Sequence, residues 1–319
     1  MQPGLVSIVI PAFQADRHIG ETLEHIAWQS YPHWELIVVE DASVGETEQI
    51  VGRFRKRNPD HRIVYIRHDV NQGPSGSRNT AIRNAEGEFI AFVDSDDLWM
   101  PNHLRASVEG LARHEVDVVY SGALMFEDHT GHLMWVWGPT KEERDRFPEG
   151  LFHRSFITPS TVVMRRAAVD RAGPFDTTPE LQGCEDVDFW LRCVSAGIRF
   201  HCIPGCHCLY RKGHAGAATS RMDRILIRHS WVLHRHYGMP AIPLKKQRDA
   251  LSRQYLLASL FNARNHPRMA AKLTLRSWRI HPMRLDRLAV GVAATGYGLA
   301  RKTAARVLDR VRRLYKGQP

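Results

Sequence analysis

The sequence predicts an α/β domain of the doubly wound type, followed by a basic helical extension. Three short apolar runs rich in Val and Ile lie at residues 5–11, 34–41 and 88–97, and helical patterns separate them. Apolar runs without polar alternation are typical of strands covered on both faces of a parallel sheet. Their alternation with helices indicates the doubly wound arrangement, in which ligands bind beyond the carboxyl ends of the strands.

Charge is divided unevenly along the chain. Residues 1–220 contain 22 Lys and Arg against 30 Asp and Glu, a net charge of −8, whereas residues 221–319 contain 22 against 4, a net charge of +18. An acidic body with a basic tail indicates that the two parts of the chain have different partners.

The first third of the chain supplies alternating strands and helices. Besides the three apolar runs, the expected elements are a helix at 19–26, a helix near 46–57, a strand at 62–68 and a helix that ends at Gly87. Both acidic clusters, Glu40-Asp41 and Asp94 to Asp97, follow strands. They should therefore lie at the binding edge of the sheet and outside its core.

The middle of the chain is mixed, and its end is helical. VVYSGALMFED and HLMWVW flank the turn DHTG and predict a hairpin, and RSFITPSTVVMRRAAVDRAG predicts a strand followed by a short helix. After residue 222 the pattern is helical and basic, with prolines at its breaks. We therefore expect three regions, at 1–110, 111–222 and 223–319.

The amino terminus, the apolar runs and the cysteines indicate the cellular compartment. No basic segment precedes an apolar one at the amino terminus, and no apolar run reaches about 18 residues, so we expect neither a secretory signal nor a transmembrane helix. Five cysteines are an odd number, and reduced thiols are the natural interpretation. We expect a cytoplasmic protein that the basic tail could hold at the inner face of the cell membrane.

The motif Asp94-Ser95-Asp96-Asp97 has two interpretations. Alternate residues at a strand end point the same way, so Asp94 and Asp96 could share one ligand. A hard divalent cation often binds through one or two carboxylates together with substrate phosphates. Alternatively, the acidic residues cap the free amides of a following helix.

Two further segments could contribute to a site. NQGPSGSRN, at 71–79, places two glycines and Arg78 at the start of a helix, where an anion could approach, but it could equally be a plain glycine turn. GCEDVDFWLRC, at 183–193, places acidic residues before an apolar helix. A carboxylate near aromatic surface can act as a general base, whereas the alternative is helix capping.

Taken together and in order, these segments resemble the family 2 glycosyltransferases of GT-A fold. The matching stretches are SIVIPAFQAD, ELIVVEDAS, GPSGSRNTAIRNAEGEFIAFVDSDDLW and GCEDVDFWLRC. LYRKGHAGAATS is similar to the family's Tyr-Arg segment and extends the resemblance to about residues 5–215. The resemblance implies an inverting enzyme that moves a sugar from a nucleotide-sugar, with a UDP-sugar expected, to a hydroxyl of a glycan or lipid-linked saccharide. Residues 1–110 would bind the donor and residues 111–222 the acceptor.

The resemblance also implies roles on the donor side. Pro11, Ala12 and Phe13 would line the nucleotide pocket, Asp41 would accept a hydrogen bond from the base, and Arg78 would lie near the nucleotide. Three residues depart from the family's usual pattern, and they put the choice of donor in doubt: Gln14 replaces Asn, Glu40 replaces Asp, and Ala42 replaces Gly.

Three carboxylates would carry the chemistry that the resemblance implies. Asp94 and Asp96 match the D-x-D motif, in which Asp94 would hold the ribose and Asp96 a divalent Mg²⁺ or Mn²⁺ bound to the diphosphate. Asp186 matches the catalytic base. These residue types suit the reaction, because the acceptor hydroxyl must lose a proton and the leaving diphosphate must be neutralised.

Other interpretations stay open at this point. HCIPGCHCLYRKGH, at 201–214, could hold zinc or could be a strand that happens to carry cysteines. The tail, with Val307, Val311 and Leu314 in an apolar stripe among arginines, suits an anionic membrane surface or packing on the body; we see no recognised nucleic-acid module. The chain could also be a non-catalytic nucleic-acid- or membrane-binding protein on a degenerate α/β scaffold, which a nucleotide-sugar turnover assay would distinguish.

Overall fold

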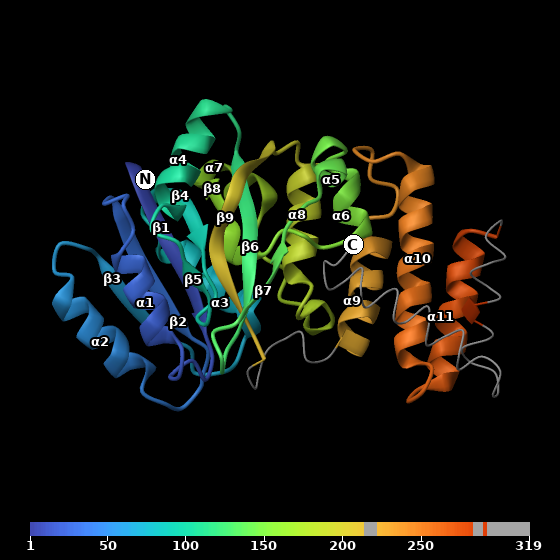
Figure 1. The fold of residues 1–319 in the computed structure, drawn as a ribbon, viewed down its shortest axis with the longest axis horizontal. Helices are drawn as coiled ribbons and strands as arrows, with labels where there is room; N and C mark the ends of the chain where they lie inside the picture. The colour runs from blue at the N-terminus through green and yellow to red at the C-terminus, as the bar shows by residue number, and fades with distance from the viewer. Residues whose placement is uncertain (214–221, 283–289, 292–319) are drawn as a thin grey trace. The chain divides into compact units, whose positions relative to one another are not determined.

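A computed structural model describes residues 1–213, 222–282 and 290–291 (Figure 1). The chain forms two compact units. The first unit contains Met1–Pro139 and Phe156–Ala215, and the second contains Thr140–Ser155 and Gly216–Pro319. The functional division at residues 110 and 222 stays a prediction.

The first unit is built on one mixed sheet. Its strands are β1 (Gln2–Ala12), β2 (Trp34–Glu40), β3 (Ile63–Arg67), β4 (Gly87–Phe92), β5 (Leu98–Trp99), β6 (Val118–Glu127), β7 (Leu133–Trp137), β8 (Val163–Arg165) and β9 (Phe200–Lys212). The strand order is β3-β2-β1-β4-β8-β6-β9-β5, and β7 pairs with β6. Strands β3, β2, β1 and β4 are parallel, whereas β8 runs antiparallel to both β4 and β6.

This topology decides which chain ends meet. Because β8 is antiparallel to β4, the start of β8 lies beside the end of β4, where Ala91 pairs with Val163. Strands β6 and β9 run parallel to each other and in the direction of β4. The residues that follow β1, β2, β4, β6 and β9 therefore share one edge of the sheet.

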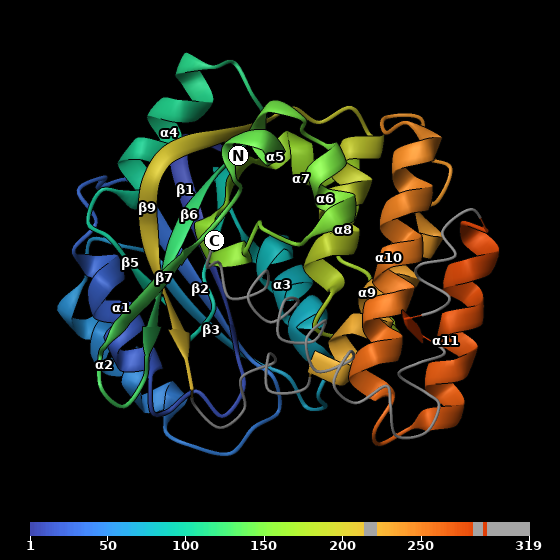
Figure 2. The ribbon, with the colours of Figure 1, turned by 45° about the vertical axis from the view of Figure 1, so that its right-hand side comes forward.

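Helices cover both faces of the sheet. The helices of the first unit are α1 (Ile19–Ala27), α2 (Thr47–Arg57), α3 (Gly73–Asn84), α4 (His103–Arg113), α7 (Arg166–Ala172) and α8 (Glu185–Ser195), with short 3₁₀ turns η1 (Pro159–Thr161) and η2 (Pro179–Leu181). Figure 2 shows α1 and α2 on one side of the strands and α3 on the other.

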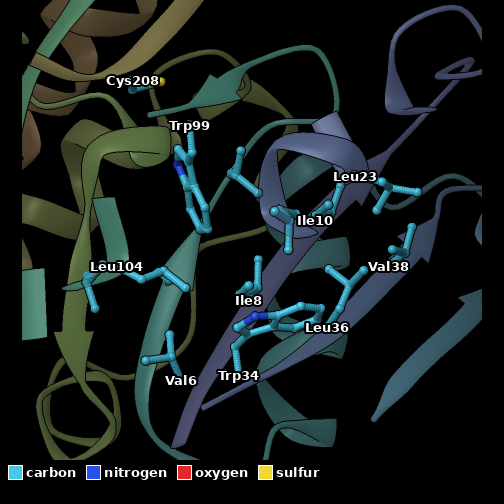
Figure 3. Packing of buried hydrophobic residues seen from close by; sticks show 14 of the residues in the cluster. Val6, Ile8, Ile10, Leu23, Trp34, Leu36, Val38, Trp99, Leu104 and Cys208 are labelled. Carbon is cyan, nitrogen blue, oxygen red and sulfur yellow. The ribbon is translucent and has the colours of Figure 1, made fainter. Parts of the chain in front are cut away.

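The alternation of side chains along the buried strands explains these layers. Ile8 and Ile10 of β1 and Leu36 of β2 point toward α1 and α4, where Leu23 and Leu104 complete the cluster in Figure 3. The opposite face carries α3, which packs on β1 and β2. Both faces of these strands are buried, so uninterrupted apolar runs were the right signal for a parallel sheet.

The second unit is helical in its described part. It contains α5 (Lys141–Asp145), α6 (Glu149–His153), α9 (Met222–Arg235), α10 (Leu244–Asn262) and α11 (Pro267–Ile280). Small hydroxyl residues join α10 to α11: Ser252 donates to the carbonyl of Ser277 at 2.9 Å, and Ser259 donates to the carbonyl of Ala270 at 2.8 Å. None of the helices described is long and apolar enough to cross a membrane.

Most predicted elements are confirmed, with shifted ends. The hairpin of β6 and β7 forms as predicted, and residues 201–212 form a strand. The run at 88–97 is strand only to Phe92, and α3 begins at Gly73 and ends at Asn84. The stripe at Val307, Val311 and Leu314 lies outside the described residues.

Candidate active site

The acidic motif lies directly after β4, and its members differ in their surroundings. Asp97 is buried, and its carboxylate accepts hydrogen bonds from the Ser160 hydroxyl at 2.5 Å and the Arg211 amide at 3.0 Å. The same Ser160 hydroxyl accepts from the Asp94 amide at 3.0 Å. Burial, with repulsion from Asp96 and Asp94, raises the pKa of Asp97 well above its usual range. Asp97 thus fixes the turn, whereas Asp94 and Asp96 are partly accessible to ligands.

Arg78 connects this motif to the acidic start of α8. Its guanidinium donates to Asp94 at 2.8 Å and to Glu185 at 3.0 Å, and its side chain is only 3% exposed. Burial would lower the pKa of Arg78, but the neighbouring carboxylates of Asp94 and Glu185 hold it above its usual value. The sequence placed Arg78 near the nucleotide; in the structure it joins two carboxylates, and direct contact with a nucleotide stays a prediction.

Asp186, the predicted base, follows Glu185 in the first turn of α8. The Asp186 carboxylate is half-buried and accepts a hydrogen bond from the Val187 amide at 2.8 Å. The surrounding protein removes water from the carboxylate and Glu185 repels it, and together they raise the pKa of Asp186 to about 7. A carboxylate with such a pKa can accept a proton near neutral pH.

Asp41, at the end of β2, anchors the start of α3. Its Oδ1 accepts from the Gln72 amide at 2.9 Å and lies 2.8 Å from Nδ1 of His68, and its Oδ2 accepts from the Gly73 amide at 2.7 Å. The carboxylate therefore neutralises the positive end of the helix dipole. These bonds leave limited accepting capacity for the predicted contact with a base, which remains a prediction.

A polar pocket borders the helix start that Asp41 holds. It has a volume of about 340 Å³ and is lined by Asn71, Gln72, Gly73, Pro74, Ser75, Thr177, Thr178, Pro179 and Gln182. Its lining contains amides and hydroxyls but no ionisable side chain. It suits a neutral polar group better than a phosphate, since the first helix amides are already bonded to Asp41.

The end of β1 presents the other predicted donor residues. Ala12 is buried and Pro11 partly buried, whereas the Phe13 side chain is 51% exposed. Phe13 is thus an accessible aromatic surface at the binding edge. The next residue, Gln14, and Ala42 after β2 both adopt left-handed conformations, with φ of 51° and 58°. The glycine usual in the family would fit the position of Ala42 without the strain of a Cβ atom.

Arg211 lies near the end of β9, at the same edge of the sheet. The sequence indicated it only through the Tyr-Arg segment. Its guanidinium donates to the backbone carbonyl of Asp96 at 2.8 Å, to Asp128 at 2.9 Å and to Glu21 at 2.5 Å. Burial would raise the pKa of Asp128, but hydrogen bonds from Arg211 and His18 keep it below its usual value. This arginine therefore joins α1, β6 and β9 to the acidic motif.

The acidic motif fits a hard divalent cation with few protein ligands. Asp97 is buried and accepts hydrogen bonds at both oxygens, whereas Asp94 and Asp96 are partly accessible and are the candidate metal ligands. Among the described residues no three His, Cys, Asp or Glu side chains converge on a metal position. One or two carboxylates completed by substrate phosphates is the arrangement that Mg²⁺ commonly adopts. The same finding gives no support to zinc at residues 201–213; His214 lies outside the described part.

Comparison with known proteins agrees with the sequence motifs. The sequence profile of the family described as Glycosyl transferase family 2 matches residues 7–173. This range includes Asp94 and Asp96 and ends before Asp186. The UDP-Glc:α-D-GlcNAc-diphosphoundecaprenol β-1,3-glucosyltransferase WfaP of Escherichia coli is 29% identical over 229 residues, which cover 72% of this chain and 85% of that protein.

Solved structures share the fold. TarS 1–349 of S. aureus, in complex with UDP-GlcNAc, has a TM-score of 0.68 at 19% identity. The superposition covers 98% of this chain and 92% of the TarS chain. The mannosyltransferase PcManGT of Pyrobaculum calidifontis, in complex with GDP-Man and Mn²⁺, has a TM-score of 0.60 at 22% identity. The superposition covers 97% of this chain and 79% of the PcManGT chain. The predicted GT-A fold is confirmed, and with more than half of its length matched by the family profile, this chain belongs to glycosyl transferase family 2 and is a glycosyltransferase.

Proposed function

We propose that this glycosyltransferase is inverting and transfers a sugar from a nucleoside-diphosphate donor, a UDP-sugar by preference, to a hydroxyl of a glycan or lipid-linked saccharide. The observation that carries the proposal is the Arg78 bridge between Asp94 and Glu185. It holds Asp94, which we assign to the donor, beside the Glu185-Asp186 pair, in which we assign Asp186 as the base. Donor and acceptor chemistry can therefore meet at one edge of the sheet.

Asp186 acts as the general base in this proposal. It takes the proton of the acceptor hydroxyl while that oxygen forms a bond to the anomeric carbon of the donor. The bond from this carbon to the diphosphate breaks, and the nucleoside diphosphate leaves with the electron pair. A single attack from the face opposite the leaving group inverts the anomeric configuration.

The donor is held along the ends of β1, β2 and β4. Phe13 offers an aromatic face against which a base can stack. The pocket beside Asp41 suits a neutral polar part of the nucleoside. Asp94 is assigned to the ribose and Asp96 to Mg²⁺ or Mn²⁺, which, when bound, supplies positive charge to the leaving diphosphate. The Mn²⁺ complex of PcManGT supports this assignment by analogy of fold.

The acceptor class is inferred from a relative. WfaP acts on a saccharide linked through diphosphate to undecaprenol, and 72% of this chain aligns with it. We assign the same class of acceptor here, with the enzyme working at the surface that contains it.

The basic second unit suits an anionic leaflet. Helix α11 contains no acidic residue, and its exposed positions include Arg268, Lys272 and Arg279. Each basic side chain near such a surface contributes about 1 kcal/mol, screened by salt. The variant Arg268→Glu/Lys272→Glu should therefore bind anionic vesicles more weakly at low salt. Binding equal to that of the wild type in co-sedimentation would dismiss this role.

The role of the metal is tested at Asp96. We expect Asp96→Ala to lower kcat/KM for UDP-sugar turnover by about 10²-fold or more, because charge on the leaving diphosphate is no longer neutralised. Asp60→Asn, which changes an exposed carboxylate after α2, is the matched control and should retain activity. Undiminished turnover by the wild type in EDTA would contradict the assignment.

A further inference from the structure

The acidic turn that follows β4 is held through its backbone. The amide of its last residue donates to the carbonyl of its first at 3.1 Å, which closes Asp94–Asp97 on itself. Two distant elements hold the carbonyls between these ends. The hydroxyl of Thr22, in α1, donates to the carbonyl of Ser95 at 3.0 Å, and Arg211 donates to the carbonyl of Asp96 at 2.8 Å. Because both Thr22 and Arg211 are buried, the backbone of the turn is held in place before any ligand binds.

Ser160, in the 3₁₀ turn η1, connects the two ends of this acidic turn through a single hydroxyl group. Its Oγ donates to Oδ2 of Asp97 at 2.5 Å and accepts from the amide of Asp94 at 3.0 Å. Ser160 is fully buried, with an exposed fraction of 0%. A serine hydroxyl has one proton to donate, and here it donates to a carboxylate, which makes the stronger kind of hydrogen bond. Because both ends of the turn bond to one atom, the position of Ser160 sets the distance between them.

Ser160 is itself held by the backbone around it. Two backbone hydrogen bonds, of 3.0 and 2.9 Å, close η1. The indole nitrogen of Trp99, a buried residue, donates to the carbonyl of Ser160 at 2.7 Å. Directly after η1, the carbonyl of Val162 accepts from the amide of Phe92, at the end of β4, at 3.2 Å. The serine hydroxyl is thus supported by the strand that the acidic turn follows.

We propose that Ser160 is a positioning residue, which holds the turn in the shape that presents the Asp96 carboxylate to Mg²⁺ or Mn²⁺. This inference rests on the proposed function, which assigns Asp96 to the metal. Asp96 lies between the two residues that Ser160 bonds, so a change in their spacing displaces its side chain. Mg²⁺ accepts little departure from octahedral geometry, and with few protein ligands its affinity depends on how well each carboxylate is placed.

Asp94 has a support that does not involve Ser160. Its carboxylate accepts from the Arg78 guanidinium at 2.8 Å, so its side chain stays in place when the bond to its amide is lost. Loss of the Ser160 hydroxyl should therefore weaken metal binding at Asp96, while binding of the donor at saturating metal changes little. A merely structural role would instead lower turnover at every metal concentration. Metal dependence is thus the readout that identifies a positioning role.

The test uses the full-length protein with Mn²⁺ and UDP. Binding of Mn²⁺ is measured in the presence of saturating UDP from the fall of the EPR signal of the free ion. We expect Ser160→Ala to bind Mn²⁺ about tenfold more weakly than the wild type, because two hydrogen bonds that shape the turn are lost. Ser121→Ala is the matched control. It removes another buried hydroxyl, which donates to the Gly122 carbonyl at 3.0 Å in β6, and it should bind Mn²⁺ as the wild type does.

Turnover gives a second readout. The Mn²⁺ concentration for half-maximal turnover of a UDP-sugar should rise about tenfold in Ser160→Ala, while kcat and the donor KM at saturating Mn²⁺ stay within about twofold of the wild type. If Ser160→Ala does not fold, Ser160→Cys is measured in the same way. Its thiol is a weaker donor of similar size, and we expect Mn²⁺ binding about threefold weaker than that of the wild type.

A double-mutant cycle with Asp97→Asn tests the bond between the two side chains. Asp97→Asn removes the acceptor of the Ser160 proton together with one negative charge, and the charge contributes equally in both backgrounds. The combined loss of Mn²⁺ affinity should therefore be smaller than the sum of the two single losses.

The outcomes separate this inference from the proposed function. Equal Mn²⁺ affinity of the wild type and the Ser160 variant, additive effects in the cycle, or a fall in kcat that saturating Mn²⁺ does not recover would overturn the inference alone. A wild type that binds no Mn²⁺, or that works fully in EDTA, would contradict the assignment of Asp96 to the metal and overturn the inference with it.

Discussion

Asp186→Asn is expected to lower kcat by about 10²-fold or more while donor affinity changes little. Asparagine keeps the size of the side chain and its contact with the Val187 amide but cannot accept a proton. Turnover is measured with a UDP-sugar and a diphosphate-linked acceptor, and donor binding by calorimetry. Glu180→Gln, which changes an exposed carboxylate in the 3₁₀ turn η2 before α8, is the matched control and should keep normal turnover.

The pH profile gives this prediction a second readout. A base is active when deprotonated, and the pKa of Asp186 is raised to about 7, so kcat/KM of the wild type should rise with pH to about 7 and level off above it. The variant should lack this rise. Since the raised pKa means that the folded protein disfavours the Asp186 charge, Asp186→Asn should also be at least as stable as the wild type at pH 8. Near-normal kcat with an unchanged pH profile would contradict the assignment of Asp186 as the base and leave it a structural role in the first turn of α8.

Arg78→Met should have the largest effect on stability. It leaves the buried Glu185 and the partly exposed Asp94 without their shared cation, and breaking a buried ion pair by removing one partner typically costs about 3–5 kcal/mol. We expect a corresponding fall in the free energy of unfolding, measured by urea denaturation at pH 7.5, together with loss of turnover. Arg78→Lys should be intermediate, because an ammonium group lacks the planar fork that contacts two carboxylates at once.

A double-mutant cycle isolates the bridge. Arg78→Met/Glu185→Gln should recover part of the lost stability, since one of the two unpaired carboxylates is removed. Turnover should remain low, because Asp94 still lacks the hydrogen bond from the Arg78 guanidinium that holds its carboxylate in place. If the effects of Arg78→Met and Glu185→Gln on the free energy of unfolding simply add, the two side chains are not coupled, and the bridge does not organise the site.

The sequence by itself determined the class of fold and the order of its elements, and it predicted most of the acidic residues of the candidate site. Val- and Ile-rich runs without polar alternation are typical of parallel strands that helices cover on both faces. The carboxyl ends of parallel strands lie at one edge of the sheet, so the pattern alone placed Asp41 and Asp94 at the same edge. The hairpin of β6 and β7 followed in the same way from local patterns and a polar turn. These are short-range consequences of side-chain chemistry and strand geometry.

Only the tertiary structure decided how the charges at that edge are paired. Arg78 and Glu185 are separated by 107 positions, and Arg211 and Asp96 by 115, so no local pattern could show that they touch. The antiparallel course of β8 brings Ser160 to the Asp94–Asp97 turn, and nothing near Ser160 in the chain announces that contact. Pairing of buried charges depends on which elements the sheet order makes neighbours, and that order follows from how the whole chain packs. The sequence could therefore name Asp94, Asp96 and Asp186, while the residues that hold the acidic motif and the start of α8 in place became visible only in three dimensions.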